Sequence, residues 1–321
     1  MVIRVARLEK NSKCRPRTKK NDGILGDIKK NYELYLFVIP AVLVMLVFHY
    51  FPIYGVQIAF KNFSPGLGIL KSPWCGFDNF KEFFNSYQFT DILWNTISLS
   101  MYELFVGFPF PILLALMLNL LRQQRYKKVI QMVTYAPHFI STVVMVSMIT
   151  LFLDPQVGII NKIIAALGAE PISFMSSTKW YKTVYVFSGI WQGCGWSSII
   201  YFASLSSVSP DLHEAAIVDG ASRLDRIWHV DIPCILPTIV IMLILRSGQI
   251  LNIGFEKSYL MQNSLNLPVS NVISTYVYQT GLRQSRYDYS TAVGLFNSVV
   301  NIILLLTVNK ISKAVGETSL W

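Results

Sequence analysis

Charged residues are scarce in this chain of 321 residues. Asp, Glu, Lys and Arg make up 14% of it, against roughly 25% in soluble domains, whereas hydrophobic residues make up 53%. The mean hydropathy is +0.44, which excludes an ordinary soluble domain. Several windows exceed the ~18 consecutive apolar residues that are typical of a membrane-spanning helix. The chain is therefore predicted to be an all-α membrane protein.

Motifs for catalysis and nucleotide binding are also missing. No G-x-x-x-x-G-K-[ST] loop occurs, so the chain itself is not expected to bind ATP. No G-x-S-x-G occurs, and His213-Glu214 lacks the second histidine of H-E-x-x-H because position 217 is Ile. The four cysteines show no paired spacing. We therefore expect no catalytic residue, no metal site and no cofactor bound by this chain.

Six apolar windows are predicted to span the membrane. The fourth is the least apolar, and the first is too long for the apolar region of a signal peptide, which has roughly 7–15 residues. The predicted bounds are 35–60, 93–120, 129–153, 184–205, 232–255 and 291–311. The expected architecture is a bundle of six transmembrane helices, divided into a basic segment 1–31, a first span with an outer interfacial segment 32–92, and a core 93–321.

Lys and Arg are distributed unevenly along the chain. Residues 1–31 hold ten of them against three acids, and the loop 121–128 holds four and no acid, whereas 61–91 holds three of each sign. Cytoplasmic segments of membrane proteins are enriched in Lys and Arg. Both chain ends and the loop 209–237 are therefore predicted to be cytoplasmic. The net charge of +10 is mostly this topology signal; contact with anionic lipid is an unspecific addition, and nucleic-acid binding is not expected.

The polar loop between the fourth and fifth spans is longer than a simple connection requires. Ser209-Pro210-Asp211 has the residues of a helix start, namely a cap, a proline at the first position and a carboxylate in the first turn. Gly220 is expected to end or bend this helix, and Pro233 opens the next apolar run. Ordinary connections have about 2–6 residues. A structured loop of this length therefore favours a partner.

This loop resembles the EAA loop of ABC importer permeases, E-A-A-x-x-x-G-A followed by L-P-x-x-x-P. The matching residues are Glu214, Ala215, Ala216, Asp219, Gly220, Ala221, Pro233 and Pro237, with Ile232 where the family favours Leu. Gly76-Phe77-Asp78-Asn79-Phe80 resembles the G-L-x-N-F box of maltose-type carbohydrate permeases and predicts a turn leading into a short helix. Gly254-Phe255-Glu256-Lys257 is similar to the LplB/YteP branch, which serves complex oligosaccharides.

The resemblance implies a type I ABC importer permease fold in which the EAA loop, 209–237, forms a cytoplasmic coupling helix. It implies a second homologous permease subunit, two ATPase subunits that hold ATP and magnesium, and an extracellular sugar-binding lipoprotein. The substrate would be an oligosaccharide, carried by alternating access across a bacterial cytoplasmic membrane. The alternative for the loop helix is an amphipathic helix that lies in the lipid headgroups.

Two charged residues are predicted to lie near mid-membrane. Arg246 is thirteen residues beyond Pro233, which is about 20 Å along a helix, and Glu103 is roughly 15 Å deep in the second span. Charges at that depth are costly and usually mark a pathway or a partner. One hypothesis is that Arg246 faces the pore and binds an acidic sugar such as a uronate. The alternative is a structural Arg246–Glu103 pair.

Polar residues of the later spans form a second set of candidates, because sugars need hydroxyl partners and an aromatic face. The hypothesis is a translocation cavity lined by Ser188, Gln192, Trp196, Gln249, Asn252, Asn297 and Asn301. The alternative for each of them is a hydrogen bond between packed helices. Gly189 and Gly193 have small-xxx-small spacing, which is predicted to let two helices approach closely.

Three other functions compete with an oligosaccharide importer. An ion-coupled secondary transporter needs intramembrane carboxylates, and only Glu103 qualifies. A membrane-embedded enzyme needs a nucleophile or metal set, for which no motif is seen. An ABC permease for a non-sugar solute, such as an amino acid, stays open because the EAA loop does not determine the substrate.

Overall fold

The computed structural model describes residues 31–121 and 123–314. The predicted basic segment 1–31 lies, apart from Asn31, outside the described residues. The described chain is helical, and the β-bridge between Lys61 and Trp74 is isolated. Two compact units, Met1–Val56 and Gln57–Trp321, divide the chain. The division at residues 31 and 92 stays a prediction.

The first unit contains most of one long apolar helix, Tyr32–Phe60. It changes type along its length, in the order α2 (Tyr32–Met45), a π turn (Leu46–Tyr50), α3 (Phe51–Ile53) and a 3-10 segment (Tyr54–Phe60). Pro52 follows the π turn closely, and a proline ring clashes with the carbonyl of the preceding turn in a regular α-helix. The wider turn gives that ring room. The helix agrees with the first predicted span.

The second unit opens with two short helices, α4 (Gly68–Lys71) and α5 (Asp78–Asn85). Gly76 has a φ of +62°, a left-handed conformation that glycine adopts without strain. The amide of Asn79 donates to the carbonyl oxygens of Ala59 and Lys61 at 3.0 and 3.3 Å. The predicted turn into a short helix is thus confirmed, and it is tied to the chain that precedes it.

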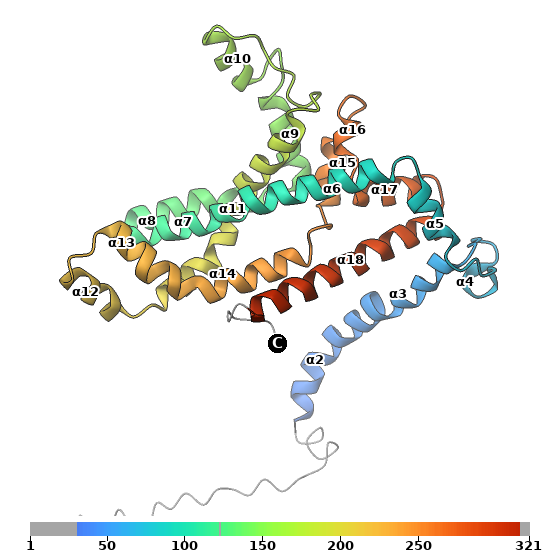
Figure 1. Cartoon of the computed structure of the whole chain (residues 1–321), viewed down its shortest axis with the longest axis horizontal. Helices are drawn as coiled ribbons and strands as arrows, with labels where there is room; N and C mark the ends of the chain where they lie inside the picture. The colour runs from blue at the N-terminus through green and yellow to red at the C-terminus, as the bar shows by residue number, and fades with distance from the viewer. Residues whose placement is uncertain (1–30, 122, 315–321) are drawn as a thin grey trace, which may run out of the picture. The chain divides into compact units, whose positions relative to one another are not determined.

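Four long helical segments form the body of the second unit (Figure 1). They are α6 (Phe89–Tyr102) with the π turn η3 (Glu103–Gly107) and α7 (Pro109–Leu120), then α11 (Tyr181–Ser206), α14 (Ile232–Ser247) and α18 (Tyr287–Ala314). α11 packs against both α7 and α14, and α14 packs against α18. A buried cluster of Ala115, Leu116, Tyr201, Leu205 and Ile235 holds α7, α11 and α14 together.

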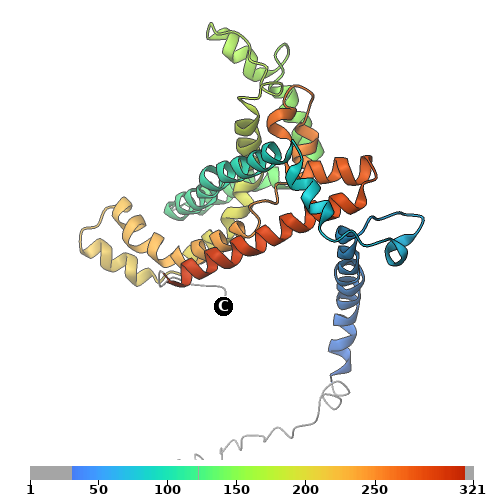
Figure 2. The same cartoon turned by 45° about the vertical axis from the view of Figure 1, so that its right-hand side comes forward.

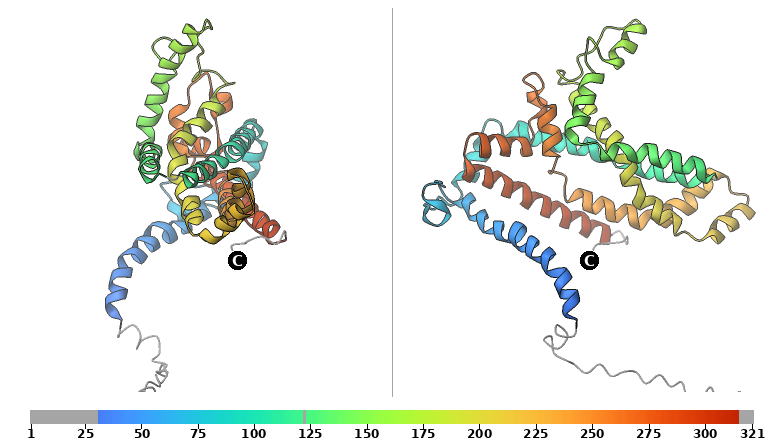
Figure 3. Two further views of the ribbon diagram at one scale, coloured as in Figure 1. Left: turned by 90° about the vertical axis from the view of Figure 1, so that its left-hand side faces the viewer. Right: turned by 180° about the vertical axis from the view of Figure 1, so that it is seen from behind.

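The third predicted span, 129–153, is not a straight helix. α8 (Gln124–Tyr135) continues into a 3-10 turn (Ala136–Phe139), and α9 (Thr142–Phe152) then leaves at an angle of 103°. Pro137 cannot donate a backbone hydrogen bond, and the Ser141 hydroxyl caps α9 by accepting from the amide of Val144. Beyond α9, α10 (Ile159–Ala166) extends away from the other long helices of this unit (Figures 2 and 3).

The fifth predicted span, 232–255, ends earlier than expected. The continuous helix runs from Arg223 to Ser247, and residues 248–254 form turns and irregular backbone. Three short helices and a π turn come next, in the order α15 (Phe255–Met261), α16 (Leu267–Ser270), α17 (Ile273–Tyr278) and η6 (Gln279–Arg283). The sequence is apolar enough to continue the helix, but the backbone of 248–252 forms local turns, and the amide of Leu251 finds its partner on α18 instead.

The predicted number of six spans is only partly matched. Among the described residues, four helices are long and apolar enough to cross a membrane, or five if the bent α8–α9 pair is one span. α11 has 26 residues, which is about 39 Å of helix and long enough to cross. It is not among the four because polar and small residues dilute its apolar character. The second and sixth spans are the helices Phe89–Leu120 and Tyr287–Ala314, each a few residues longer than predicted.

Candidate functional site

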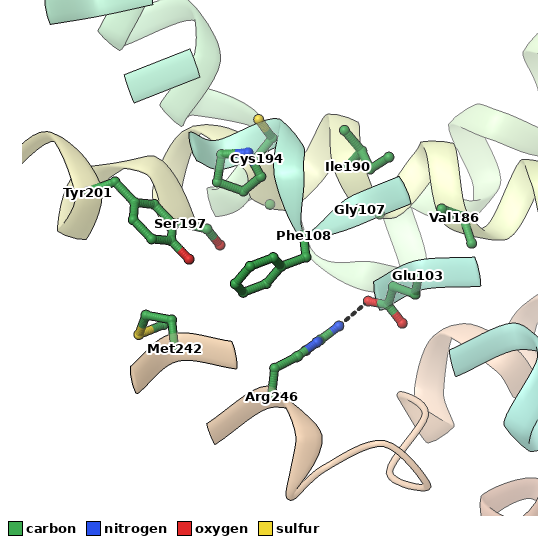
Figure 4. A pocket seen from close by; sticks show the side chains of 13 residues that line it. Glu103, Gly107, Phe108, Val186, Ile190, Cys194, Ser197, Tyr201, Met242 and Arg246 are labelled. Carbon is green, nitrogen blue, oxygen red and sulfur yellow. Dashed lines mark hydrogen bonds and ion pairs between the residues drawn. The ribbon is translucent and has the colours of Figure 1, made fainter. Parts of the chain in front are cut away.

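Glu103 and Arg246 meet at the centre of the candidate site. Glu103 begins the π turn between α6 and α7, and π turns in otherwise regular helices are frequent at functional sites. Arg246 belongs to the last turn of α14. Its Nη2 donates a hydrogen bond to Glu103 Oε1, and the two side chains are 46% and 32% exposed. The pair is therefore open to a cavity and not sealed in the core (Figure 4).

The cavity beside this pair has a volume of about 320 Å³. It lies between α7, α11 and α14, and one face of α11 supplies most of its wall (Figure 4). The lining residues are Glu103, Gly107, Phe108, Pro111, Val186, Gly189, Ile190, Gly193, Cys194, Ser197, Tyr201, Met242 and Arg246. A smaller cavity of about 20 Å³ adjoins it and is also lined by Glu103 and Arg246, with Gln249 and Asn252.

Two glycines of α11 have a different role from the predicted one. A Cβ at Gly193 would have no described atom within 4 Å, and a Cβ at Gly189 would meet only the Lys257 ammonium, 3.0 Å away. Both glycines keep the cavity open and do not bring two helices together. The close approach is at Gly195, where a Cβ would overlap the carbonyl of Thr134 on α8. The prediction that Gly189 and Gly193 let two helices approach closely is therefore wrong, and Gly195 does so instead.

Lys257 is a charged residue that the sequence patterns did not place in the site. Its Nζ donates to the carbonyl oxygen of Tyr185 at 2.6 Å and lies 4.2 Å from the centre of the Tyr185 ring. It also lies 3.0 Å from the position that a Cβ would take at Gly189, a residue that lines the cavity. The Arg246–Glu103 pair thus lines the cavity, and Lys257 places a second cation close beside its wall. Its position within the Gly254–Lys257 motif was a signal that this lysine matters.

Part of the irregular backbone after α14 is satisfied by neighbouring helices, and the rest forms local turns. The amide nitrogen of Leu251 donates to Asn301 Oδ1 at 3.1 Å, and the Ser100 hydroxyl donates to the carbonyl of Ile250. Backbone without regular structure is tolerated at membrane depth only where protein buries it or where it lines a water-filled cavity. Asn252 Oδ1 in turn accepts from Asn297 at 2.7 Å and from Asn301 at 3.1 Å. These amides hold the break in position.

The structure separates the remaining predicted pathway residues from the main cavity. Ser188 is buried and its hydroxyl donates to the Tyr185 carbonyl at 2.9 Å. Gln192 donates to the Ile140 carbonyl at 3.0 Å, which is an interhelical hydrogen bond. Trp196 stacks on His138, with ring centres 4.6 Å apart and planes at 3°. None of these three lines the cavity of Glu103 and Arg246, and their contact with substrate stays a prediction.

The EAA loop forms a short helix with well-defined ends. α12 (Pro210–Val218) begins after Ser209, whose hydroxyl accepts from the Asp211 amide, as the sequence predicts. At its end, the Gly220 amide donates to Ile217 O at 3.0 Å and the Ala221 amide donates to Ala216 O at 2.9 Å. This pair of bonds is a Schellman motif, and it needs the left-handed φ of +82° at Gly220.

The surface of this loop is unusually apolar. Val218 is 86% exposed, Leu224 67% and Trp228 66%, and Glu214 and Ala215 are also exposed. Several large apolar groups exposed within one short loop are typical of a contact with another protein. The loop continues through α13 (Arg223–Arg226) and the π turn η5 (Ile227–Asp231) directly into α14. A force on α12 therefore has a short path to the helix that carries Arg246.

Comparison with known proteins agrees with this geometry. Protein LplB of Bacillus subtilis (strain 168) is 47% identical over 297 residues, covering 92% of this chain and 93% of its own. The polygalacturonan/rhamnogalacturonan transport system permease protein YteP of the same organism is 42% identical over 302 residues, covering 94% of each.

Solved structures show the same fold. A crystal structure of a bacterial ABC transporter involved in the import of the acidic polysaccharide alginate contains a chain 40% identical to this one, with a TM-score of 0.83 over 90% of this chain and 97% of the other. The model of the family "Binding-protein-dependent transport system inner membrane component" matches residues 107–316. The chain thus belongs to the family of binding-protein-dependent transport system inner membrane components.

Proposed function

We propose that this chain is a permease subunit of an ATP-driven ABC importer of oligosaccharides. The exposed EAA loop carries the proposal, because an ATP-driven permease must present a structured surface to a separate ATPase. The similarity to LplB and YteP supports the substrate class, and YteP is named for polygalacturonan and rhamnogalacturonan transport. A similar chain, 38% identical, occurs in a bacterial alginate ABC transporter in complex with an alginate pentasaccharide-bound periplasmic protein.

The proposed assembly has this chain beside a second, homologous permease subunit. Two ATPase subunits bind ATP and magnesium, and one of them binds α12 through Glu214 and the exposed apolar groups of the loop. An extracellular binding protein delivers the sugar. This chain contributes neither a catalytic residue nor a cofactor. Both chain ends and the EAA loop face the cytoplasm, as the placement of Lys and Arg indicates.

We further propose that the cavity of Glu103 and Arg246 contacts the carboxylate groups of an acidic oligosaccharide. Arg246 and Lys257 outnumber Glu103 in charge, so a carboxylate in the cavity would balance the surplus. Arg246 is only half-buried and its guanidinium has further donors free for a bidentate contact. In this proposal Glu103 holds Arg246 in place while the cavity is empty, and a substrate carboxylate displaces Glu103 during transport.

Ion-coupled transport is the less favoured alternative. It needs a carboxylate that takes up and releases a proton or a cation during the cycle. Glu103, the candidate from the sequence, is instead engaged by Arg246. A guanidinium stays charged in proteins, so it competes with any coupling ion for this carboxylate.

The decisive experiment measures the ATPase rate of the purified assembly in lipid. A panel of oligosaccharides is added with the binding protein, matched in length and differing in charge, such as oligogalacturonates and their methyl esters. The expected result is stimulation by oligosaccharide, stronger for the free acids. If no ATPase subunit co-purifies with this chain, or if transport occurs without one, the proposed importer function is contradicted.

Lys257 allows a separate test of the acidic substrate. Replacing Lys257 by Gln is expected to weaken stimulation by the free acids and to leave that by the methyl esters unchanged, whereas Lys257→Arg keeps the preference. The loss of one hydrogen bond to a charged group is about 1.5–3 kcal/mol, or roughly tenfold or more in affinity. Equal effects on both sugars would show that Lys257 does not contact the carboxylate.

A further inference from the structure

Asp231 lies where the EAA loop joins a membrane helix, and it contacts two other helices. Its side chain is only 3% exposed. One oxygen, Oδ1, lies 3.4 Å from His213 Nε2 on α12 and 3.3 Å from Asn119 Nδ2 in the last turn of α7. Asp231 itself is the last residue of η5, directly before α14. A single carboxylate oxygen therefore joins α12, α7 and the start of α14.

Two side chains approach the buried carboxylate of Asp231 from different helices. An ionised carboxylate without partners is costly in a dry environment. His213 Nε2 lies 3.4 Å from Asp231 Oδ1, and the amide of Asn119 donates to the same oxygen at 3.3 Å. The Arg226 Nε is buried and has no hydrogen-bond partner among the described residues. His213 and Asn119 thus share one acceptor, the Oδ1 of Asp231.

The π turn places Asp231 in this position. A π turn adds a residue to the helical turn and rotates the residues after it relative to a regular α-helix. Within η5, His229 is exposed and its Nδ1 contacts the Asp225 carbonyl at 2.9 Å, whereas Asp231 is buried. The apolar neighbours Ile227 and Ile232 pack against the cluster that joins α7, α11 and α14. The turn therefore directs the Asp231 carboxylate inward, toward Asn119 and His213 and beside an apolar cluster.

The two membrane helices held by Asp231 are the ones that carry the charged pair of the cavity. Arg246 is fifteen residues beyond Asp231, which is about 22 Å along α14. Glu103 is sixteen residues before Asn119, which is about 24 Å along the helix of α7. The two helical segments that lead from the Asp231 junction to Arg246 and to Glu103 are thus nearly equal in length.

We propose that Asp231 is the positioning residue that transmits displacement of α12 to α7 and α14 together. This inference rests on the proposed function, in which an ATPase subunit binds α12. The contact with His213 makes the carboxylate follow α12. The contact with Asn119 then moves the end of α7 together with the start of α14. The spacing of Glu103 and Arg246 then responds to the ATPase. Without the shared carboxylate, displacement of α12 reaches α14 only through α13 and η5 and no longer reaches α7.

The experiment measures ATP hydrolysed per oligosaccharide transported by the assembly in proteoliposomes. Asp231→Asn and His213→Ala are expected to raise this ratio about fivefold or more, the lower end for a coupling free energy between two sites. His213→Gln, which retains a donor near the position of Nε2, is expected to restore most of the coupling. His229→Ala is the matched control, because His229 lies in the same loop and contacts the Asp225 carbonyl instead.

Two further results separate this inference from the proposed function. The double variant His213→Ala/Asp231→Asn is expected to be no worse than Asp231→Asn alone, because loss of the carboxylate already removes the partner of His213. An unchanged ratio in His213→Ala assemblies that still retain their ATPase would overturn the role of Asp231 and leave the importer intact. Loss of the ATPase from the unaltered assembly would overturn the importer itself. If Asp231→Asn does not assemble, the comparison of His213→Ala with His213→Gln decides.

Discussion

Arg246 and Glu103 are 143 residues apart in the chain and form an ion pair across two helices. Each lies where its helix departs from regular α geometry. Glu103 begins a π turn, and Arg246 precedes the end of α14 by one residue. A cation in the last turn of a helix is favoured by the helix dipole. The pair therefore joins two local irregularities at the wall of one cavity.

Reversing this pair distinguishes its structural role from substrate binding. In Arg246→Glu/Glu103→Arg the ion pair can re-form, so we expect the assembly to be recovered at near-normal yield. Arg246→Ala alone leaves Glu103 without its partner and is expected to reduce the yield, because an unpaired charge at membrane depth is costly. The measurement is the amount of assembled transporter after detergent extraction and gel filtration.

Transport by the reversed pair tests the second role. If Arg246 binds a substrate carboxylate, the reversed variant assembles but loses uptake of acidic oligosaccharides, because the position on α14 is now negative. Full uptake by the reversed variant would show that the pair is structural only. Arg246→Lys is the control: it keeps the charge and loses the bidentate geometry, so a partial loss is expected.

Two glycines one half-turn apart on α11 give a matched test of the packing. Gly195→Ala is expected to destabilise the protein by roughly 1–3 kcal/mol, because the new methyl group would overlap the backbone of Thr134, which cannot move aside easily. Gly193→Ala is expected to have little effect on stability, since nothing lies within 4 Å of its Cβ position. The thermal midpoint in detergent measures both. Equal midpoints would contradict the close approach at Gly195.

The sequence predicted the elements of this fold better than their breaks. Long apolar runs identified the second and sixth spans to within a few residues, and Ser209, Pro210 and Gly220 located both ends of α12. The bend in the third span and the early end of the fifth depend on partners elsewhere in the chain. Asn301, fifty residues away, supplies the acceptor for the Leu251 amide, and no local pattern reveals such a contact.

The candidate site shows the same limit. Depth along a helix brought Glu103 and Arg246 to the same level, and the structure pairs them. The wall of the cavity on α11 follows a helical period through Gly189, Gly193 and Ser197, but small residues at that spacing also predict close helix packing. Only the position of the neighbouring helix decides between the two. Lys257 lies beyond the break in the fifth span, so counting residues along a straight helix could not place it.

Gly220→Ala tests the end of the coupling helix. The left-handed φ of +82° is strained for alanine by roughly 1 kcal/mol, so the Schellman turn is expected to open or to shift. We expect fewer ATPase subunits to be recovered with the variant, because the exposed groups after the turn change direction relative to α12. Quantitative co-purification measures this. Gly220→Asn is the control, since asparagine tolerates this conformation better, and it is expected to retain more of the ATPase.

The Glu82–Arg286 ion pair gives a prediction in acid. Arg286 Nη1 and Nη2 each donate to a different oxygen of Glu82 at 2.7 Å, which ties α5 to the start of α18. The hydrogen bonds from Arg286 hold the pKa of Glu82 below the usual value of 4.5. A carboxyl whose pKa is lower in the folded state stabilises that state fully above its unfolded pKa, and this contribution is lost as the pH falls through the folded value.

We therefore expect acid to separate the unaltered protein from Glu82→Gln. Near neutral pH the unaltered protein should unfold at a slightly higher temperature, by an amount that reflects less than about 1 kcal/mol, because both side chains are about half exposed and are screened by solvent. Below pH 4.5 the two unfolding temperatures should converge. A difference that persists in acid would contradict the pair as its source. When Arg286 is replaced by Gln, Glu82 loses the partner that lowers its pKa. In that background, proteins with Glu82 and with Glu82→Gln should show no difference in unfolding temperature that depends on pH.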